Sequence, residues 1–131
     1  MSAAETLLKL ATAIDEHRWE DLPALLDPEF TCRYVHTGEV LDRDGWVRLN
    51  AEYPGFEHLE VEDLVADGDR AVSRAHVTGT ADGRLEHFEV ATFVTVRDGL
   101  VVEMTEVWAD VGQDAPAGTR PGPAAPGAHL A

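Results

Sequence analysis

Three two-residue turn signals divide the second half of this chain into four strand-forming segments of similar length. The dipeptides Gly68-Asp69, Asp82-Gly83 and Asp98-Gly99 lie between runs that are rich in β-branched and aromatic residues. Dipeptides of this kind favour the tight turns that join neighbouring antiparallel strands. The sequence therefore predicts a long antiparallel meander, with strands at about 57–66, 70–80, 85–96 and 100–110.

The first half of the chain predicts helices. Ser2 and Glu5 have the spacing of a capping box, and apolar residues follow at helical spacing. The next expected elements are a short helix at about 19–26, a strand at 30–36, and a third helix that starts near Asp42 or Asp44 and ends before Pro54. This order is typical of an α+β domain, in which three N-terminal helices cover one face of a bent antiparallel sheet.

Composition changes after Asp110. The segment 112–131 consists mostly of Gly, Pro and Ala and has almost no large apolar side chains. Such a segment cannot bury enough apolar surface to offset the entropy cost of ordering it. We therefore expect one domain at 1–111 and a flexible tail at 112–131.

The charge of the chain limits its partners. It has 25 acidic and 10 basic side chains, which give a formal net charge of −15 at pH 7. Because such a surface repels phosphate backbones and anionic lipids, we expect no nucleic-acid partner and no membrane partner. The N-terminus has no recognisable secretory signal, and Cys32 is the single cysteine. These features favour a reduced, cytoplasmic setting.

The turns also predict which residues share a face of the sheet. A tight hairpin at Asp82-Gly83 pairs His76 with Glu89, and one at Asp98-Gly99 pairs Glu106 with Ala91. Side chains alternate between the two faces of a sheet, so one face receives a polar and aromatic set. This set is Arg74, His76, His87, Glu89, Phe93, Met104, Glu106 and Trp108. A β-bulge in either hairpin would move part of the set to the other face.

The opposite predicted face is apolar. It carries Phe88, Val90, Val94, Val96, Val101 and Val107. One face of the sheet has to line the interior under the helices, so an apolar face on the other side needs a different cover. We expect this outer face to meet a second copy of the chain in a homodimer.

These elements resemble the SnoaL-like branch of the nuclear transport factor 2-like superfamily over about residues 3–111. The resemblance rests on Asp63-Leu64-Val65 before Gly68-Asp69-Arg70, and on Arg97-Asp98-Gly99 before a last strand with an acid in its middle. It implies a cone-shaped domain that encloses a pocket for a small organic molecule. The superfamily includes polyketide cyclases, ketosteroid isomerase, epoxide hydrolases, dehydratases and non-enzymatic carriers, so the activity has to be argued from the site.

The resemblance implies an acid/base role for Glu106, which stands where SnoaL cyclases carry an aspartate on the last strand. Limonene-epoxide hydrolase has an Arg and an Asp two residues apart on the middle strand, whereas this chain has Arg74 and His76, which argues against epoxide hydrolysis. The apolar neighbours Met104 and Trp108 favour a raised pKa for Glu106. An ion pair with Arg74 would instead keep it ionised, and the sequence leaves both alternatives open.

His76 opposite Glu89 is either an oriented acid/base pair or a polar pair with a structural role. His76, His87 and Glu89 have the residue types of a metal site, but their spacing is not diagnostic, and we expect neither a metal nor a cofactor. The side chains expected to contact a ligand are Tyr34, His36, Trp46, Asn50, Tyr53, His87, Glu89, Phe93, Met104 and Trp108.

The sequence thus predicts a cofactor-independent cyclase, isomerase or dehydratase that acts on a polyketide-like or other cyclic, carbonyl-bearing molecule. In this hypothesis Glu106 moves the proton, His76 assists it and Arg74 orients an oxygen of the substrate. The alternatives are a non-catalytic carrier that uses the same pocket, and an accessory protein whose cavity is vestigial.

Overall fold

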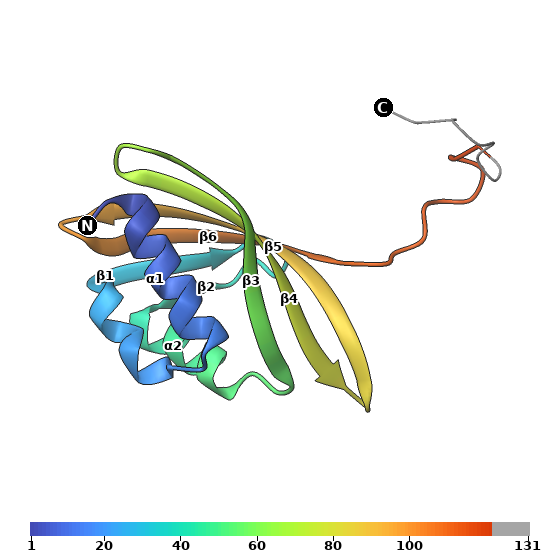
Figure 1. Ribbon diagram of the computed structural model, residues 1–131, viewed down its shortest axis with the longest axis horizontal. Coiled ribbons are helices and arrows are strands. Elements are labelled where there is room, and N and C mark those ends of the chain that lie inside the picture. Colours follow the sequence, from blue (N-terminus) through green and yellow to red (C-terminus); the bar gives the residue numbers. More distant parts are fainter. Residues whose placement is uncertain (122–131) are drawn as a thin grey trace.

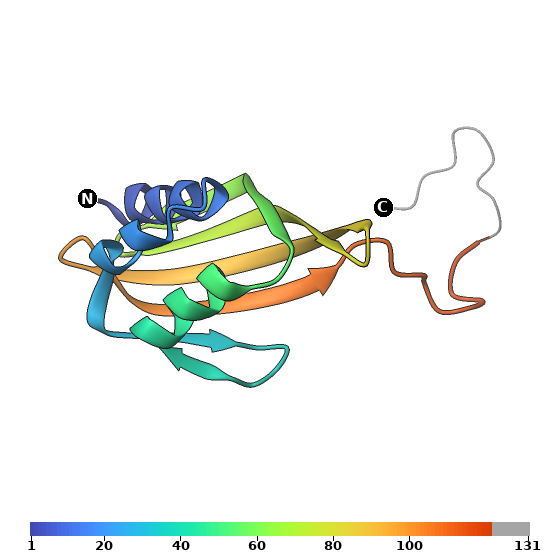
Figure 2. The same cartoon turned by 90° about the horizontal axis from the view of Figure 1, so that it is seen from below.

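The computed structural model describes residues 1–121 and shows a curved, six-stranded sheet with helices on one side (Figures 1 and 2). In chain order the elements are α1 (Ala3–Asp15), the 3-10 turns η1 (Trp19–Asp21) and η2 (Pro23–Leu25), β1 (Leu26–Tyr34), β2 (Val40–Asp42), α2 (Arg43–Glu52), β3 (Phe56–Asp67), β4 (Arg70–Ala81), β5 (Arg84–Arg97) and β6 (Leu100–Asp110). The predicted α+β class is confirmed. The second predicted helix is a pair of 3-10 turns, and β2 is an additional short strand.

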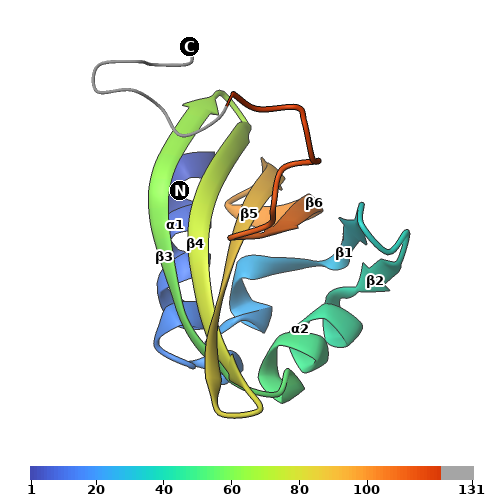
Figure 3. The ribbon, with the colours of Figure 1, turned by 90° about the vertical axis from the view of Figure 1, so that its right-hand side faces the viewer.

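The sheet has the strand order β2-β1-β6-β5-β4-β3. The β1–β6 pair is parallel and the other pairs are antiparallel. The sheet curves from β3 and β4 round to β1 and β2, and α1 and α2 lie within the curve (Figure 3). We call the face toward the helices the inner face and the opposite face the outer face. The sheet remains open, because β2 and β3 are its two edges.

Local sequence signals account for most element boundaries. The Ser2 hydroxyl accepts a hydrogen bond from the Glu5 amide and the Glu5 carboxylate accepts one from the Ser2 amide, so the predicted capping box is present. Asp42 caps α2 by accepting a hydrogen bond from the Gly45 amide. Asp82 and Asp98 adopt positive φ angles of 52° and 54°, as the tight turns of these hairpins require.

A β-bulge in β6 changes which side chains share a face. The β5–β6 register follows the turn as far as the Val96–Val101 pair and then shifts by one residue, which leaves Val102 without a partner. Beyond this point Glu106 lies opposite Thr92. An extra residue in one strand inverts the alternation of every residue that follows it.

The bulge makes the predicted division of the two faces wrong. His76 does lie opposite Glu89 in β4–β5, as the turn predicts. However, Glu106 and its β6 neighbours Met104 and Trp108 are on the inner face. Of the predicted set, the residues that do lie on the outer face are Arg74, His76, His87, Glu89 and Phe93.

The predicted apolar outer face is wrong for the same reason. Phe88, Val90, Val94, Val96 and Val101 lie on the inner face and pack in the domain's own hydrophobic core. Of the residues predicted for that surface, Val107 does lie outside, where its side chain is 41% exposed. The expected homodimer therefore needs other outer residues, such as Val65 and Phe93, and it stays a prediction.

The core lies between α1, α2 and the inner face, and its largest fully buried side chains are Trp46 and Phe30. No helix in residues 1–121 combines the length and the apolar character that a membrane crossing needs. The described part of the predicted tail, 112–121, has no helix or strand. The remainder, 122–131, lies outside the described residues, and the division at residue 111 stays a prediction.

We expect the substitution Gly55→Ala to lower the free energy of unfolding by about 3 kcal/mol or more. Gly55 has φ +79°, and a methyl group on it would overlap the carbonyl oxygen of Thr80. Gly68 is the matched control, because it also has a positive φ of 59° but has open space around it. Gly68→Ala should cost only about 1 kcal/mol, from the backbone conformation alone. Equal losses in chemical denaturation would show that the contact at Thr80 is not tight.

Candidate active site

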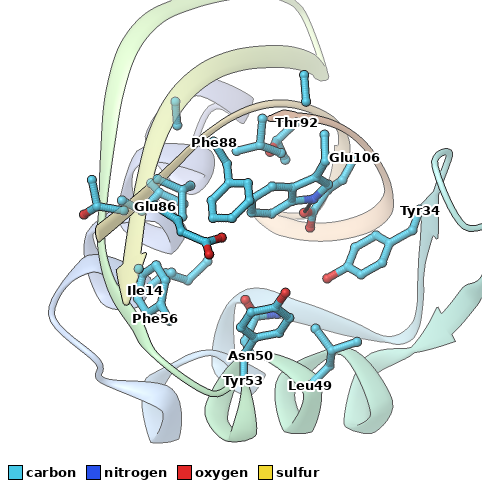
Figure 4. A pocket seen from close by; sticks show the side chains of 18 of the residues that line it. Ile14, Tyr34, Leu49, Asn50, Tyr53, Phe56, Glu86, Phe88, Thr92 and Glu106 are labelled. Atoms are coloured by element: carbon cyan, nitrogen blue, oxygen red, sulfur yellow. Dashed lines mark hydrogen bonds between the residues drawn. The ribbon is translucent and has the colours of Figure 1, made fainter. Parts of the chain in front are cut away.

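A cavity of about 620 Å³ lies between the inner face of the sheet and helices α1 and α2 (Figure 4). Its wall is largely apolar and includes Leu10, Ile14, Leu49, Phe56 and Phe88. This volume is within the range of pockets that enclose small organic molecules. Exposed residues of the lining, such as Tyr53 and Glu86, mark the side on which the cavity opens to solvent.

Glu106 projects from the middle of β6 into this cavity and is only 5% exposed. The indole N–H of Trp46 donates a hydrogen bond of 2.9 Å to Oε2, and the indole N–H of Trp108 donates one of 2.8 Å to Oε1. The Sγ of Cys32 lies 3.7 Å from Oε2 and supplies a weak third donor. Each carboxyl oxygen thus has a neutral donor, and among residues 1–121 no cation is paired with Glu106.

These surroundings raise the pKa of Glu106. Burial is the main cause, because it removes the ionised carboxylate from water, and the hydrogen bonds from Trp46, Trp108 and Cys32 oppose it in part. No lysine or arginine of the described chain lines the cavity, so no positive charge compensates the burial. A carboxyl group in this setting can hold a proton nearer to neutral pH than an exposed glutamate can.

The strands and the helix around Glu106 determine which side chains lie beside it. Trp108 lies two residues further along β6, so it projects from the same face. Trp46 comes from the first turns of α2, whose start is fixed by the Asp42 cap. Tyr34 is the partner of Glu106 in the parallel β1–β6 pair and lies beside it.

Tyr34 directs its hydroxyl group into the cavity (Figure 4). Burial raises its pKa, and the nearby Glu106 raises it further, so the phenol stays protonated and can donate a hydrogen bond. The ring of His36 stacks on that of Tyr34, with centroids 5.6 Å apart. Asn50 also lines the cavity, and its amide donates a hydrogen bond of 2.9 Å to the Trp46 carbonyl oxygen.

The structure brings together only part of the predicted site. The cavity is lined by Tyr34, His36, Trp46, Asn50, Tyr53, Met104, Glu106 and Trp108, whose roles in ligand binding or catalysis stay predictions. Arg74, His76, His87, Glu89 and Phe93 project from the outer face and are absent from the cavity lining. Neither the alternative of an Arg74–Glu106 ion pair nor the predicted joint role of His76 and Glu106 is therefore possible in this fold.

Other lining residues were not predicted as site residues. Leu10 and Ile14 belong to the apolar stripe of the first helix, and this stripe could have indicated them. Ser73 and Thr92 carry hydroxyl groups on the inner face of β4 and β5. Their sequence gives no signal of the cavity, because their position depends on which face the helices cover.

Comparisons with known proteins agree with this architecture. The family model of the SnoaL-like domain matches residues 7–104. A candidate ketosteroid isomerase from Kribbella flavida DSM 17836 has 29% identity and a TM-score of 0.76, and the match covers 87% of this chain and 82% of that one. None of the curated proteins matches the sequence closely.

Two other solved structures are similar. IdmH, a candidate polyketide cyclase from Streptomyces antibioticus, has 22% identity and a TM-score of 0.73 over 82% of this chain and 92% of that one. An epoxide hydrolase of the LEH-like type from M. tuberculosis has 15% identity and a TM-score of 0.70 over 82% of each chain. At these identities the two structures show the fold alone.

The raised pKa of Glu106 predicts an unusual dependence of stability on pH. Between the reference value of 4.5 and the higher pKa of the folded state, the folded protein keeps a proton that the unfolded chain has released. Stability should therefore fall as pH rises through this window, by up to ~1.4 kcal/mol per pH unit. The loss is complete above the pKa of the folded state.

Glu106→Gln isolates this contribution, because its side chain does not ionise. The free energy of unfolding of the wild type minus that of the variant should decrease with rising pH above 4.5. Gln has one acceptor oxygen for two indole donors, which adds a constant cost at every pH. Denaturant titrations at several pH values provide the measurement. A difference that increases with pH would mean that the pKa of Glu106 is lowered rather than raised.

Proposed function

Because this chain belongs to the SnoaL-like family, we propose that it is a cofactor-independent acid–base enzyme, namely a cyclase, isomerase or dehydratase, for an uncharged cyclic molecule with a carbonyl group. The observation that carries this proposal is the buried Glu106 carboxyl group, which faces a cavity large enough for such a molecule. The similarity to the candidate ketosteroid isomerase, at 29% identity, supports the same class of chemistry.

The first chemical step would be proton transfer next to the carbonyl group of the substrate. The ionised carboxylate of Glu106 takes a proton from the α-carbon, and the electrons of the broken C–H bond move to the carbonyl oxygen to form an enolate. The Tyr34 hydroxyl can donate a hydrogen bond to this oxygen as its negative charge grows. Protonated Glu106 then returns the proton at another atom. Alternatively, the enolate carbon attacks a second carbonyl group to close a ring, and Glu106 gives its proton to the alkoxide that forms.

A raised pKa suits this cycle, because Glu106 must first accept a proton and later release it. A carboxylate paired with arginine would hold its charge too strongly to be an effective base. Trp46 and Trp108 fix the position of the carboxyl group without adding a positive charge. We assign these two residues a positioning role.

The charges of the lining also restrict the substrate. The ionisable acids Glu86, Glu106 and Asp110 line the cavity, and no lysine or arginine of residues 1–121 does. An anionic group would therefore enter a negative, poorly solvated space without a counter-charge. This favours uncharged substrates over carboxylates and phosphate esters.

A non-catalytic carrier is the second candidate function. One specific observation favours it, since both oxygens of Glu106 already accept hydrogen bonds from indoles. In a carrier this arrangement would be purely structural, and the cavity would bind the same uncharged molecules without changing them.

Deuterium exchange separates the two functions. The protein is incubated in D₂O with a panel of mono-, bi- and tricyclic ketones, and deuterium at the α-carbon is measured by mass spectrometry. An enzyme of the proposed type should accelerate the exchange of at least one ketone. Glu106→Gln should reduce that rate by about 100-fold or more, while binding changes by less than about tenfold. Tyr34→Phe should reduce it less, through weaker stabilisation of the enolate.

Binding without exchange in any member of the panel would support the carrier and contradict the enzyme. Phe93→Leu is the matched control variant, because Phe93 was predicted to contact the ligand but lies on the outer face. It should leave both binding and exchange unchanged. Glu106→Gln with wild-type exchange would exclude Glu106 as the proton-transfer group.

Charge selection gives an independent prediction. Each ketone that binds is compared with a carboxylate analogue of similar size, and binding is measured from the fluorescence of the tryptophans that line the cavity. The carboxylate should bind at least about tenfold more weakly at pH 7.5, because its burial is uncompensated. Tighter binding of the carboxylate would overturn the assignment to uncharged substrates.

A further inference from the structure

A row of connected polar side chains crosses β3, β4 and β5 on the outer face, outside the cavity. The Arg74 guanidinium contacts Glu62 at 2.7 Å and Glu89 at 2.8 Å. The second oxygen of Glu89 lies 2.7 Å from Nδ1 of His76. The row ends where Nε2 of His76 lies 2.8 Å from Nδ1 of His87.

The contact between Glu89 and His76 determines where the histidine lone pair lies. An ionised carboxylate accepts hydrogen bonds and does not donate them, so Nδ1 of His76 carries the hydrogen. In neutral His76 the lone pair is then on Nε2, which is directed at Nδ1 of His87. The two facing nitrogens therefore share a single proton, or they share another Lewis acid.

We propose that Nε2 of His76 and Nδ1 of His87 chelate a divalent transition-metal ion of the zinc type. The ion takes the place of the shared proton: neutral His87 then carries its proton on Nε2, and if the pair holds an additional proton, that one leaves to solvent. Nitrogen–zinc distances are about 2.0–2.1 Å in tetrahedral sites, which puts two nitrogen ligands about 3.3 Å apart. The two nitrogens here are 2.8 Å apart, so the rings need to separate by only about 0.5 Å to bind the ion. Imidazole nitrogens prefer zinc, copper and nickel ions to magnesium and calcium ions.

The residues around the two histidines support a metal ion. Histidines that bind metals commonly donate their other N–H to a carboxylate, as His76 does to Glu89, and this fixes the ring orientation. Arg74 in turn fixes Glu89. The ligand atoms of Glu62, His76 and Glu89 all lie within 4.8 Å of one another, so negative charge is concentrated beside His76.

The local charge also favours a cation. On β3, Glu60 lies opposite His76 and Asp63 lies opposite Arg74. With Glu62 and Glu89, this part of the outer face has more carboxylates than cations to balance them. The high net negative charge of the chain, −15, acts in the same direction.

Zinc binding to the full chain tests the proposal. The protein is treated with EDTA, dialysed and titrated with ZnCl₂ at pH 7.5 by isothermal titration calorimetry. We expect one ion per chain. His76→Ala and His87→Ala should each weaken this binding at least tenfold, and Glu89→Gln by about 10- to 100-fold. CoCl₂ should give a visible absorption band in the wild type that both histidine variants lack.

His58→Ala is the matched control. His58 is also an exposed histidine beside a carboxylate, since its Nδ1 lies 3.2 Å from Asp15, but its other nitrogen has no histidine partner within residues 1–121. Zinc affinity should stay unchanged in this variant. Circular dichroism should show that all variants fold, because His76 and His87 lie at the surface.

Three results would overturn the proposal. The first is the absence of heat and of cobalt absorption in the wild type up to millimolar metal. The second is zinc affinity that neither His76→Ala nor His87→Ala changes, which would place the ion elsewhere. The third is an equal loss in His58→Ala, which would indicate weak binding to scattered surface histidines.

Discussion

Two indole N–H groups hold the carboxyl group of Glu106 in the interior, and this contact joins the helical layer to the sheet. Trp46 belongs to α2 and Trp108 to β6, so both layers must be in place before each carboxyl oxygen has a donor. A buried carboxyl group without hydrogen bonds would cost several kcal/mol, roughly 2–7 for a polar group. Because the donors are neutral, they satisfy the group without fixing it as an anion. The same hydrogen bonds act to lower the pKa of Glu106, but they do not outweigh the effect of burial.

The bulge at Val102 places carboxyl groups of the same sheet in two different electrostatic environments. Without it, Glu106 would share the outer face with Arg74, as the uninterrupted alternation predicts. On that face partial burial acts to raise the pKa of Glu89, but hydrogen bonds from Arg74 and His76 outweigh it, and the pKa is lowered. On the inner face no described cation reaches Glu106, and burial raises its pKa. One unpaired residue in β6 thus separates an ion-paired glutamate from one suited to proton transfer.

Local sequence motifs predicted the fold well. Which residues line the cavity, in contrast, depends on the pairing register between β5 and β6. The turn dipeptides, the Ser2 cap and the position of the third helix depend on a few adjacent residues, and the structure has each of them. The error in the site came from β6, where the alternation of apolar residues is interrupted. The buried residues Val101 and Met104 are three positions apart rather than two, and Val61 and Leu64 have the same spacing at the bulge in β3. Apolar residues three positions apart can thus indicate a β-bulge in the sequence. Which face of the sheet the following side chains then occupy depends on tertiary packing.

Small side chains around the cavity leave its volume unfilled. On the inner face of β4, where larger side chains would fill the interior, the chain has Ser73 and Ala75. Unfilled volume costs packing energy, on the order of 24 cal/mol per Å³ in studies of engineered cavities. A domain that needed only stability would gain from larger residues at these positions. The small residues and the buried Glu106 both lower stability, and together they form a largely apolar space with a buried carboxyl group directed into it. A bound molecule would restore the lost contacts, which supports the proposal that the cavity is a binding site.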